Sequence, residues 1–162
     1  MNYHRIYHND FVNGEGVRTT LFVSGCDHGC KGCYNKSTWN PNNGEAFTED
    51  TVTEILDSLE PDHIAGLSLT GGDPLYHGNL SAILGLLIRL RWRYGHRKSV
   101  WMWTGYTKQE IDEGTGGEMQ MRRRILASVD VLIDGKFEQD KFEHGLPFRG
   151  STNQIIHRFT DI

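Results

Sequence analysis

The feature that most constrains this chain is a loop that holds all three of its cysteines, Cys26, Cys30 and Cys33, within eight residues. The loop directly follows the apolar run of residues 21–23, which is typical of a buried strand. Three cysteines cannot all pair as disulfides, and their crowding favours a metal centre. A cubane cluster has four irons, so three thiolates would leave one iron open to another ligand. The spacing therefore favours a [4Fe-4S] cluster held by these three cysteines.

Structural zinc is the main alternative for this loop. Zinc prefers four closed ligands, usually supplied as two separated pairs. Here a single trio stands alone, and the fourth ligand would have to be His28, His63 or His77. The trio by itself favours a cluster over zinc only modestly, so the choice depends on the other motifs. Inert buried thiols fit less well, because the loop is polar and rich in glycine.

Length and charge limit the class of protein. A formal net charge of −4 argues against a nucleic-acid-binding protein, which is usually basic. No apolar run approaches the ~20 residues of a membrane span, and residues 1–5 lack the apolar segment of a signal peptide. We expect one domain over residues 1–162, in the cytoplasm, where thiols remain reduced, with neither nucleic acid nor a membrane as partner.

Strand-like and helix-like segments alternate along the chain, which indicates βαβ units and a parallel sheet. Strands are expected at 18–25, 66–70, 99–104 and 129–133, with two weaker ones at 6–12 and 154–159. Helices are expected at 48–59, 79–94 and 118–128, with a short capped one from Thr107. A closed eight-stranded barrel needs about 250 residues. The sequence therefore predicts an α/β fold, an open partial (βα) barrel of about six mostly parallel strands.

The informative loops all follow predicted strands. They are Cys26–Tyr34, Gly71–Pro74, Thr104–Tyr106 and Asp134–Lys136. The C-terminal ends of parallel strands meet at one edge of a sheet, where α/β proteins place their active sites. We therefore expect these four loops to form one site.

The cysteine spacing resembles that of the radical S-adenosylmethionine superfamily, whose members hold a [4Fe-4S] cluster on C-x3-C-x2-C. Within that superfamily, the chain is similar to the activating proteins of anaerobic (class III) ribonucleotide reductases. The motifs that carry this likeness occur in order at residues 12–18, 32–39, 69–75, 103–106, 133–136 and 149–154. The resemblance implies a barrel of the radical SAM type, with a [4Fe-4S] cluster and S-adenosyl-L-methionine as cofactors.

The resemblance also implies which residues contact S-adenosylmethionine: Gly32, Cys33, Tyr34, Gly71, Gly72 and Asp73. The glycine-rich segment would bind the methionyl amino group, and a Cβ atom at Gly72 would stand where that ligand approaches. Taken alone, the segment is more simply explained as a glycine-rich turn after a strand, and Tyr34 as a core residue. Gly32 stands where many superfamily members carry an aromatic residue, which favours backbone contacts there. Glu15 replaces the proline that relatives usually carry.

The implied activity is the formation of a glycyl radical on the catalytic subunit of the anaerobic ribonucleotide reductase. The reduced cluster would cleave S-adenosylmethionine to methionine and a 5′-deoxyadenosyl radical, which removes a Cα hydrogen from one glycine of the reductase. The cofactor supplies this chemistry, so no catalytic side chain is expected. A flavodoxin-type protein would donate the electron.

Three alternatives remain at this stage. The chain could activate another glycyl-radical enzyme such as pyruvate formate-lyase, act on a small molecule, or be a non-catalytic zinc module. Asp134 and Lys136 fit a solvated turn as well as a cofactor-facing role, and the Arg149–Gln154 motif has no assigned role. The basic stretches at 89–93 and 122–124 are most simply solvated helix faces.

Overall fold

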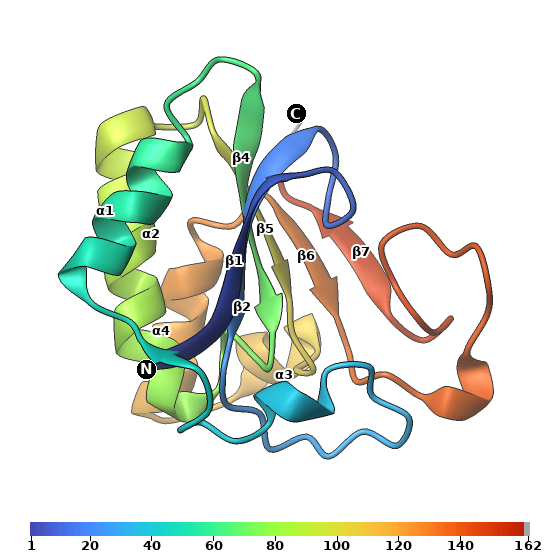
Figure 1. Cartoon of the computed structure of the whole chain (residues 1–162). Helices are drawn as coiled ribbons and strands as arrows, with labels where there is room; N and C mark the ends of the chain where they lie inside the picture. Colours follow the sequence, from blue (N-terminus) through green and yellow to red (C-terminus); the bar gives the residue numbers. More distant parts are fainter. Residues whose placement is uncertain (161–162) are drawn as a thin grey trace.

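The computed structural model describes residues 1–160 and contains one seven-stranded sheet with helices packed against it (Figure 1). The strands are β1 (Asn2–Asp10), β2 (Val17–Val23), β3 (Glu45–Ala46), β4 (Ile64–Gly71), β5 (Ser99–Trp103), β6 (Val131–Asp134) and β7 (Ile155–Arg158). The helices are α1 (Glu49–Ser58), α2 (Leu80–Tyr94), α3 (Lys108–Glu113) and α4 (Gly117–Leu126). Short 3₁₀ turns lie at Lys36–Thr38, His77–Asn79 and Gln139–Lys141. Within this part of the chain, no helix is long and apolar enough to cross a membrane.

The sheet is open and has the strand order β3-β1-β2-β4-β5-β6-β7. Strands β2, β4, β5 and β6 are parallel to one another, while β1, β3 and β7 pair in antiparallel fashion at the two sides. This confirms an α/β fold with a parallel centre, but the number of strands is seven rather than about six. The additional strand, β3, has only two residues and pairs with Asn2 and Tyr3. A strand this short has no periodicity from which it could be predicted.

The two faces of the sheet have different neighbours. Helices α1, α2 and α4 lie along one face (Figure 1), and Leu21, Leu67 and Met102 pack into the core beneath them. Because successive side chains of a strand point to opposite faces, Trp101 belongs to a second cluster, with Val131 and Ile133. That second face borders the cavity described below, and the segment between β6 and β7 extends away from the helices.

Local hydrogen bonds set the helix starts where the sequence predicts them. Thr48 caps α1 in a reciprocal pair with Thr51, and Thr107 does the same for α3 with Glu110. Each pair satisfies amide groups that a helix start leaves free. At the end of α2, Gly95 has a φ of 58°, a conformation that glycine adopts without strain.

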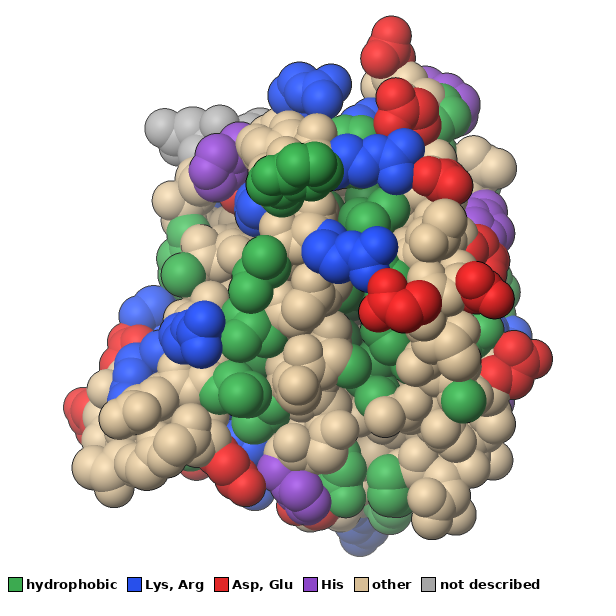
Figure 2. Space-filling model, turned by 90° about the vertical axis from the view of Figure 1, so that its left-hand side faces the viewer, with side chains coloured by type: hydrophobic (Ala, Val, Ile, Leu, Met, Phe, Trp, Pro, Cys, Tyr) green, Lys and Arg blue, Asp and Glu red, His purple; other side chains and the backbone are tan. Residues whose placement is uncertain are grey.

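The basic stretch on α2 is only partly solvated. Arg89 and Arg93 lie on the outer face and form ion pairs with acidic residues on and just after α1, so acidic and basic side chains intermix on the helix side of the molecule (Figure 2). Arg91 instead turns inward, 2.7 Å from the buried Asp130. The expectation of a fully solvated face is therefore wrong for Arg91, because its carboxylate partner lies on a different element.

Candidate cluster and cofactor site

The four strand-end loops line one cavity of about 520 Å³. Its wall includes all three cysteines, Gly71–Asp73, Thr104 and Gly105, and Gly135 and Lys136. This confirms that parallel strands bring the loops to one edge of the sheet. The β1–β2 hairpin and the segment before β7 complete the wall, with Val12, Asn13, Phe148, Arg149 and Gln154. The volume lies within the range of ordinary ligand pockets, about 300–1,000 Å³.

Backbone hydrogen bonds join the start of the cysteine loop to residues 38 and 39, which follow the last cysteine. The amide of Gly25 donates to the carbonyl of Thr38 at 2.7 Å, and that of Cys26 donates to Trp39 at 3.1 Å. Gly29 and Gly32, on either side of Cys30, have φ values of 65° and 78°. Other residue types rarely adopt these angles, so the loop needs glycine at both places to turn its thiols toward the cavity.

The three thiols share one electrostatic environment. Burial raises the pKa of Cys26 to about 12, and the nearby thiols of Cys30 and Cys33 act in the same direction. Burial also raises the pKa of Cys30, while the Phe137 amide and the Lys136 charge oppose the rise. The Asn35 amide lies 3.4 Å from the Cys33 sulfur. The thiolates would therefore need positive metal charge and amide donors; the donors are in place, so the loop fits an iron–sulfur cluster.

These thiols line one part of the cavity wall and do not converge on a single point. Among residues 1–160, no three His, Cys, Asp or Glu side chains converge closely enough to hold a single metal ion. In a cubane cluster each thiolate binds a different iron, so the sulfurs need not converge.

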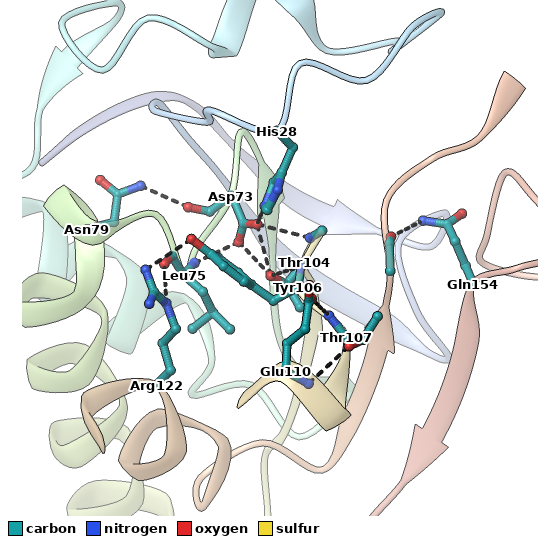
Figure 3. Close-up of polar contacts among 12 residues, drawn as sticks. His28, Asp73, Leu75, Asn79, Thr104, Tyr106, Thr107, Glu110, Arg122 and Gln154 are labelled. Carbon is teal, nitrogen blue, oxygen red and sulfur yellow. Dashed lines mark hydrogen bonds and ion pairs between the residues drawn. The ribbon is translucent and has the colours of Figure 1, made fainter. Parts of the chain in front are cut away.

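His28 lines the same cavity as the thiols and is bonded to Asp73 (Figure 3). Its Nε2 lies 2.5 Å from Oδ2 of that carboxylate. The same carboxylate accepts from the Thr104 hydroxyl at 2.9 Å and from the amides of Leu75 and Gly105 at 2.8 and 3.0 Å. A Cβ atom at Gly105 would lie 2.4 Å from the His28 ring, so only glycine fits there. Asp73 thus ties three of the four loops together.

The Gly-Gly-Asp-Pro segment is also bonded to the cysteine loop through its backbone. The Gly72 amide donates to Val23 and the Asp73 amide to Gly25, each at 2.8 Å. A Cβ at Gly72 would lie 2.5 Å from the Gly25 carbonyl oxygen and 2.9 Å from that of Thr38. The expectation that this Cβ would face a ligand is therefore wrong, because it would point into the cysteine loop. The amides of Gly72 and Asp73 are therefore already bonded within the protein and are not free to bind a ligand in the cavity.

Comparison with known proteins agrees with this geometry. A family model described as "4Fe-4S single cluster domain" matches residues 12–157, which include all three cysteines. The chain is 48% identical over 162 residues to the anaerobic ribonucleoside-triphosphate reductase-activating protein of Vibrio cholerae and 50% identical to that of Pasteurella multocida, covering 99% of each chain. The Escherichia coli protein of that name is 46% identical over 97% of this chain and 98% of its own. This chain belongs to the family of anaerobic ribonucleoside-triphosphate reductase-activating proteins.

In this member of the activating-protein family, all but one of the residues expected to contact the cofactor line the cavity. Cys33, Tyr34, Gly71, Gly72 and Asp73 line the cavity, whereas Gly32 is not part of the lining. A Cβ at Gly32 would meet the Gln139 side chain at 3.0 Å. Tyr34 is 76% exposed and lies beside Phe137, with ring centroids 5.8 Å apart. The alternative that Tyr34 packs in the core is therefore wrong.

Arg122 is buried and bonds two residues next to the site, although the sequence suggests that it lies on a solvated helix face. Its side chain is 3% exposed, and its guanidinium donates to the Leu75 carbonyl at 2.9 Å and to the Tyr106 hydroxyl at 3.1 Å (Figure 3). It also lies 4.3 Å from the centroid of the Tyr106 ring. The one signal in the sequence is its place three residues before the buried Ile125, on the same face of α4.

Asp134 and Lys136, whose roles the sequence leaves open, have different surroundings in the structure. The Asp134 carboxylate accepts from the Lys108 amide at 2.6 Å, at the start of α3, and lies 3.0 Å from His157. Asp134 therefore secures a helix start away from the cavity. Lys136 is among the residues that line the cavity.

Proposed function

We propose that this chain activates anaerobic ribonucleoside-triphosphate reductase by generating a glycyl radical on its catalytic subunit. The observation that carries the proposal is the cavity itself, which places all three thiols beside the Gly-Gly-Asp-Pro segment. The relatives that bear this activating name match nearly the whole chain, which supports the same partner here.

In this proposal Cys26, Cys30 and Cys33 hold a [4Fe-4S] cluster and the rest of the cavity holds S-adenosylmethionine. Held by these three thiols, the cluster would supply the single electron needed to cleave the S–C5′ bond of S-adenosylmethionine, giving methionine and the 5′-deoxyadenosyl radical that would abstract a glycine Cα hydrogen of the reductase. These reaction steps require no proton transfer by the protein, so we assign no catalytic acid or base.

The residues of the chain bind and orient the reactants. The carbonyl groups of Gly71 and Gly72 are the acceptors that we propose for the methionyl amino group. Cys33 and Tyr34 would lie along the adenine, with a backbone contact at Cys33, whereas Gly32, which does not line the cavity, would set the turn that presents them. Asp73 would act through His28 and Gly105, since its carboxylate is already occupied by them. We propose that residues 1–162 work as one radical SAM domain.

The open sheet gives the reductase access to the cavity. Strands β3 and β7 end the sheet at opposite sides and do not pair with each other. We propose that a loop of the reductase enters through this gap, because an incomplete wall would leave the cavity accessible from the side. A flavodoxin-type protein is the electron donor that we propose, in the cytoplasm, where a reduced cluster is protected.

The test is electron paramagnetic resonance of the reductase after anaerobic incubation with this protein, S-adenosylmethionine and a reductant. We expect an organic radical signal that disappears with the Cys30→Ala variant and persists with Lys31→Ala, an exposed neighbour in the same loop. No signal with fully reconstituted protein would contradict the proposal. A signal on pyruvate formate-lyase alone would show that the partner is wrong. Zinc without iron and sulfide in anaerobically purified protein would favour the zinc module.

A further inference from the structure

The Arg149–Gln154 motif forms a compact turn just before β7. The Gln154 side-chain oxygen accepts from the amides of Gly150 and Ser151, at 2.9 and 3.2 Å. The Arg149 guanidinium donates to the Gln154 carbonyl at the other end of the turn. Ser151 is fully buried. The motif is therefore held by its own side chains, and it presents its remaining groups to a neighbouring segment.

That neighbour is the loop after β6. The Gln154 Nε2 donates to the Gly135 carbonyl at 3.0 Å (Figure 3), and the Asn153 Nδ2 donates to the Lys136 carbonyl at 2.8 Å. Two amide side chains of the motif thus bind two successive carbonyls of this loop. A third bond runs from the Glu138 amide to the Ser151 hydroxyl, at 3.2 Å.

The loop held in this way lies against the cysteine loop. The Phe137 ring lies beside Tyr34, and a Cβ atom at Gly150 would come within 3.0 Å of that ring. Residues 136 and 137 line the cavity together with Cys30. The motif therefore contacts the loop that packs against the cysteine loop and shares the cavity wall with Cys30.

We propose that Asn153 and Gln154 are positioning residues, which hold residues 135–137 against the cysteine loop and so fix the places of Lys136 and Phe137 in the cavity wall that they share with Cys30. The inference rests on the proposed function, in which Cys30 is a cluster ligand. Hydrogen bonds to cluster sulfurs and nearby charges tune the reduction potential of an iron–sulfur centre. Side chains that orient such groups commonly contribute about 10- to 100-fold to metal affinity or activity.

Gln154→Met is the main test, because methionine has nearly the same length and no charge but cannot donate to Gly135. Gln109→Met is the matched control, since Gln109 is exposed on α3, where it bonds only Glu113. Iron and sulfide content, midpoint potential, the paramagnetic spectrum of the reduced cluster and S-adenosylmethionine affinity by calorimetry would be measured on all three proteins. We expect Gln154→Met to retain its iron, to shift the potential and the spectrum, and to bind S-adenosylmethionine about tenfold or more weakly.

A merely structural role would lower the thermal midpoint of Gln154→Met and leave its potential and spectrum equal to those of Gln109→Met. That result would overturn the inference. If Gln154→Met does not fold, Asn153→Leu decides by the same criteria, because Asn153 is only half-buried and its loss removes one bond, to Lys136. Failure of the unmutated protein to assemble a cluster would contradict the proposed function. Normal assembly with an unchanged Gln154 variant would contradict the positioning role alone.

Discussion

The Nε2 atom of His28 lies 2.5 Å from Oδ2 of Asp73, and the two side chains are 7% and 2% exposed. This contact joins the cysteine loop to the loop after β4, across 45 positions of sequence. Because the same carboxylate also binds Thr104 and the Gly105 amide, the thiols and the glycine-rich segment cannot move independently. The geometry of the cysteine loop and that of the Gly-Gly-Asp-Pro segment are therefore coupled through one buried carboxylate.

Asp73→Asn tests this coupling. An amide nitrogen in place of Oδ2 would face the hydrogen-bond donors Gly105 and Thr104, so a buried network would lose its acceptor. We expect the free energy of unfolding of the metal-free protein to fall by about 2–3 kcal/mol, and S-adenosylmethionine affinity to fall with it. Urea denaturation and calorimetry would measure the two effects. Asp62→Asn, at an exposed loop position, should change neither; equal behaviour of both variants would remove Asp73 from its central role.

Gly105→Ala tests the packing of the histidine. The new methyl group would lie 2.4 Å from the His28 ring, so the ring must leave its place beside Asp73. We expect a loss of about 1–3 kcal/mol in the free energy of unfolding. Gly85→Ala, within α2, is the control because a Cβ there meets nothing within 4 Å; it should stabilise the protein by about 0.5–1 kcal/mol. A neutral Gly105→Ala would show that His28 is loosely held.

The Cys26 thiol should react slowly in the metal-free protein. Its pKa rises from 9.0 to about 12, mainly through burial, and the thiolate is the reactive form. We expect alkylation of Cys26 at pH 8 to be at least tenfold slower than that of a free cysteine, as followed by mass spectrometry of the modified peptide. Between pH 9.0 and about 12 the folded state binds more protons at this site than the unfolded chain, so stability should fall with rising pH. Rapid alkylation of Cys26 at pH 8 would contradict a raised pKa for this thiol.

Direct hydrogen abstraction can be followed with isotope. Deuterium at the α-carbons of the reductase glycines should appear in 5′-deoxyadenosine, because in the proposed mechanism the 5′-deoxyadenosyl radical takes the hydrogen atom without an intermediary. Mass spectrometry of the nucleoside would detect it, and replacement of the target glycine by alanine should abolish both the transfer and the organic radical. An activated reductase with no deuterium in the nucleoside would mean that a further carrier lies between them.

Local chemistry explains what could be predicted without the structure. The capping pairs at Thr48 and Thr107 join residues three positions apart, so neighbouring residues encode them. The parallel strands follow from continuous apolar runs, and the rule that their C-terminal ends share one edge suffices to collect the four loops. The three cysteines and their spacing carry the cluster prediction in the same way.

The sequence by itself therefore determined the α/β class, the helix starts and the set of loops around the site. Tertiary structure alone decided that Arg122 is buried under Tyr106, that β3 adds a seventh strand, and that the Gly72 Cβ would face the Gly25 carbonyl. It also decided that Asn153 and Gln154 hold the loop after β6. The physical reason is distance along the chain: these contacts join residues that only the order and curvature of the sheet bring together, and no short-range pattern records them.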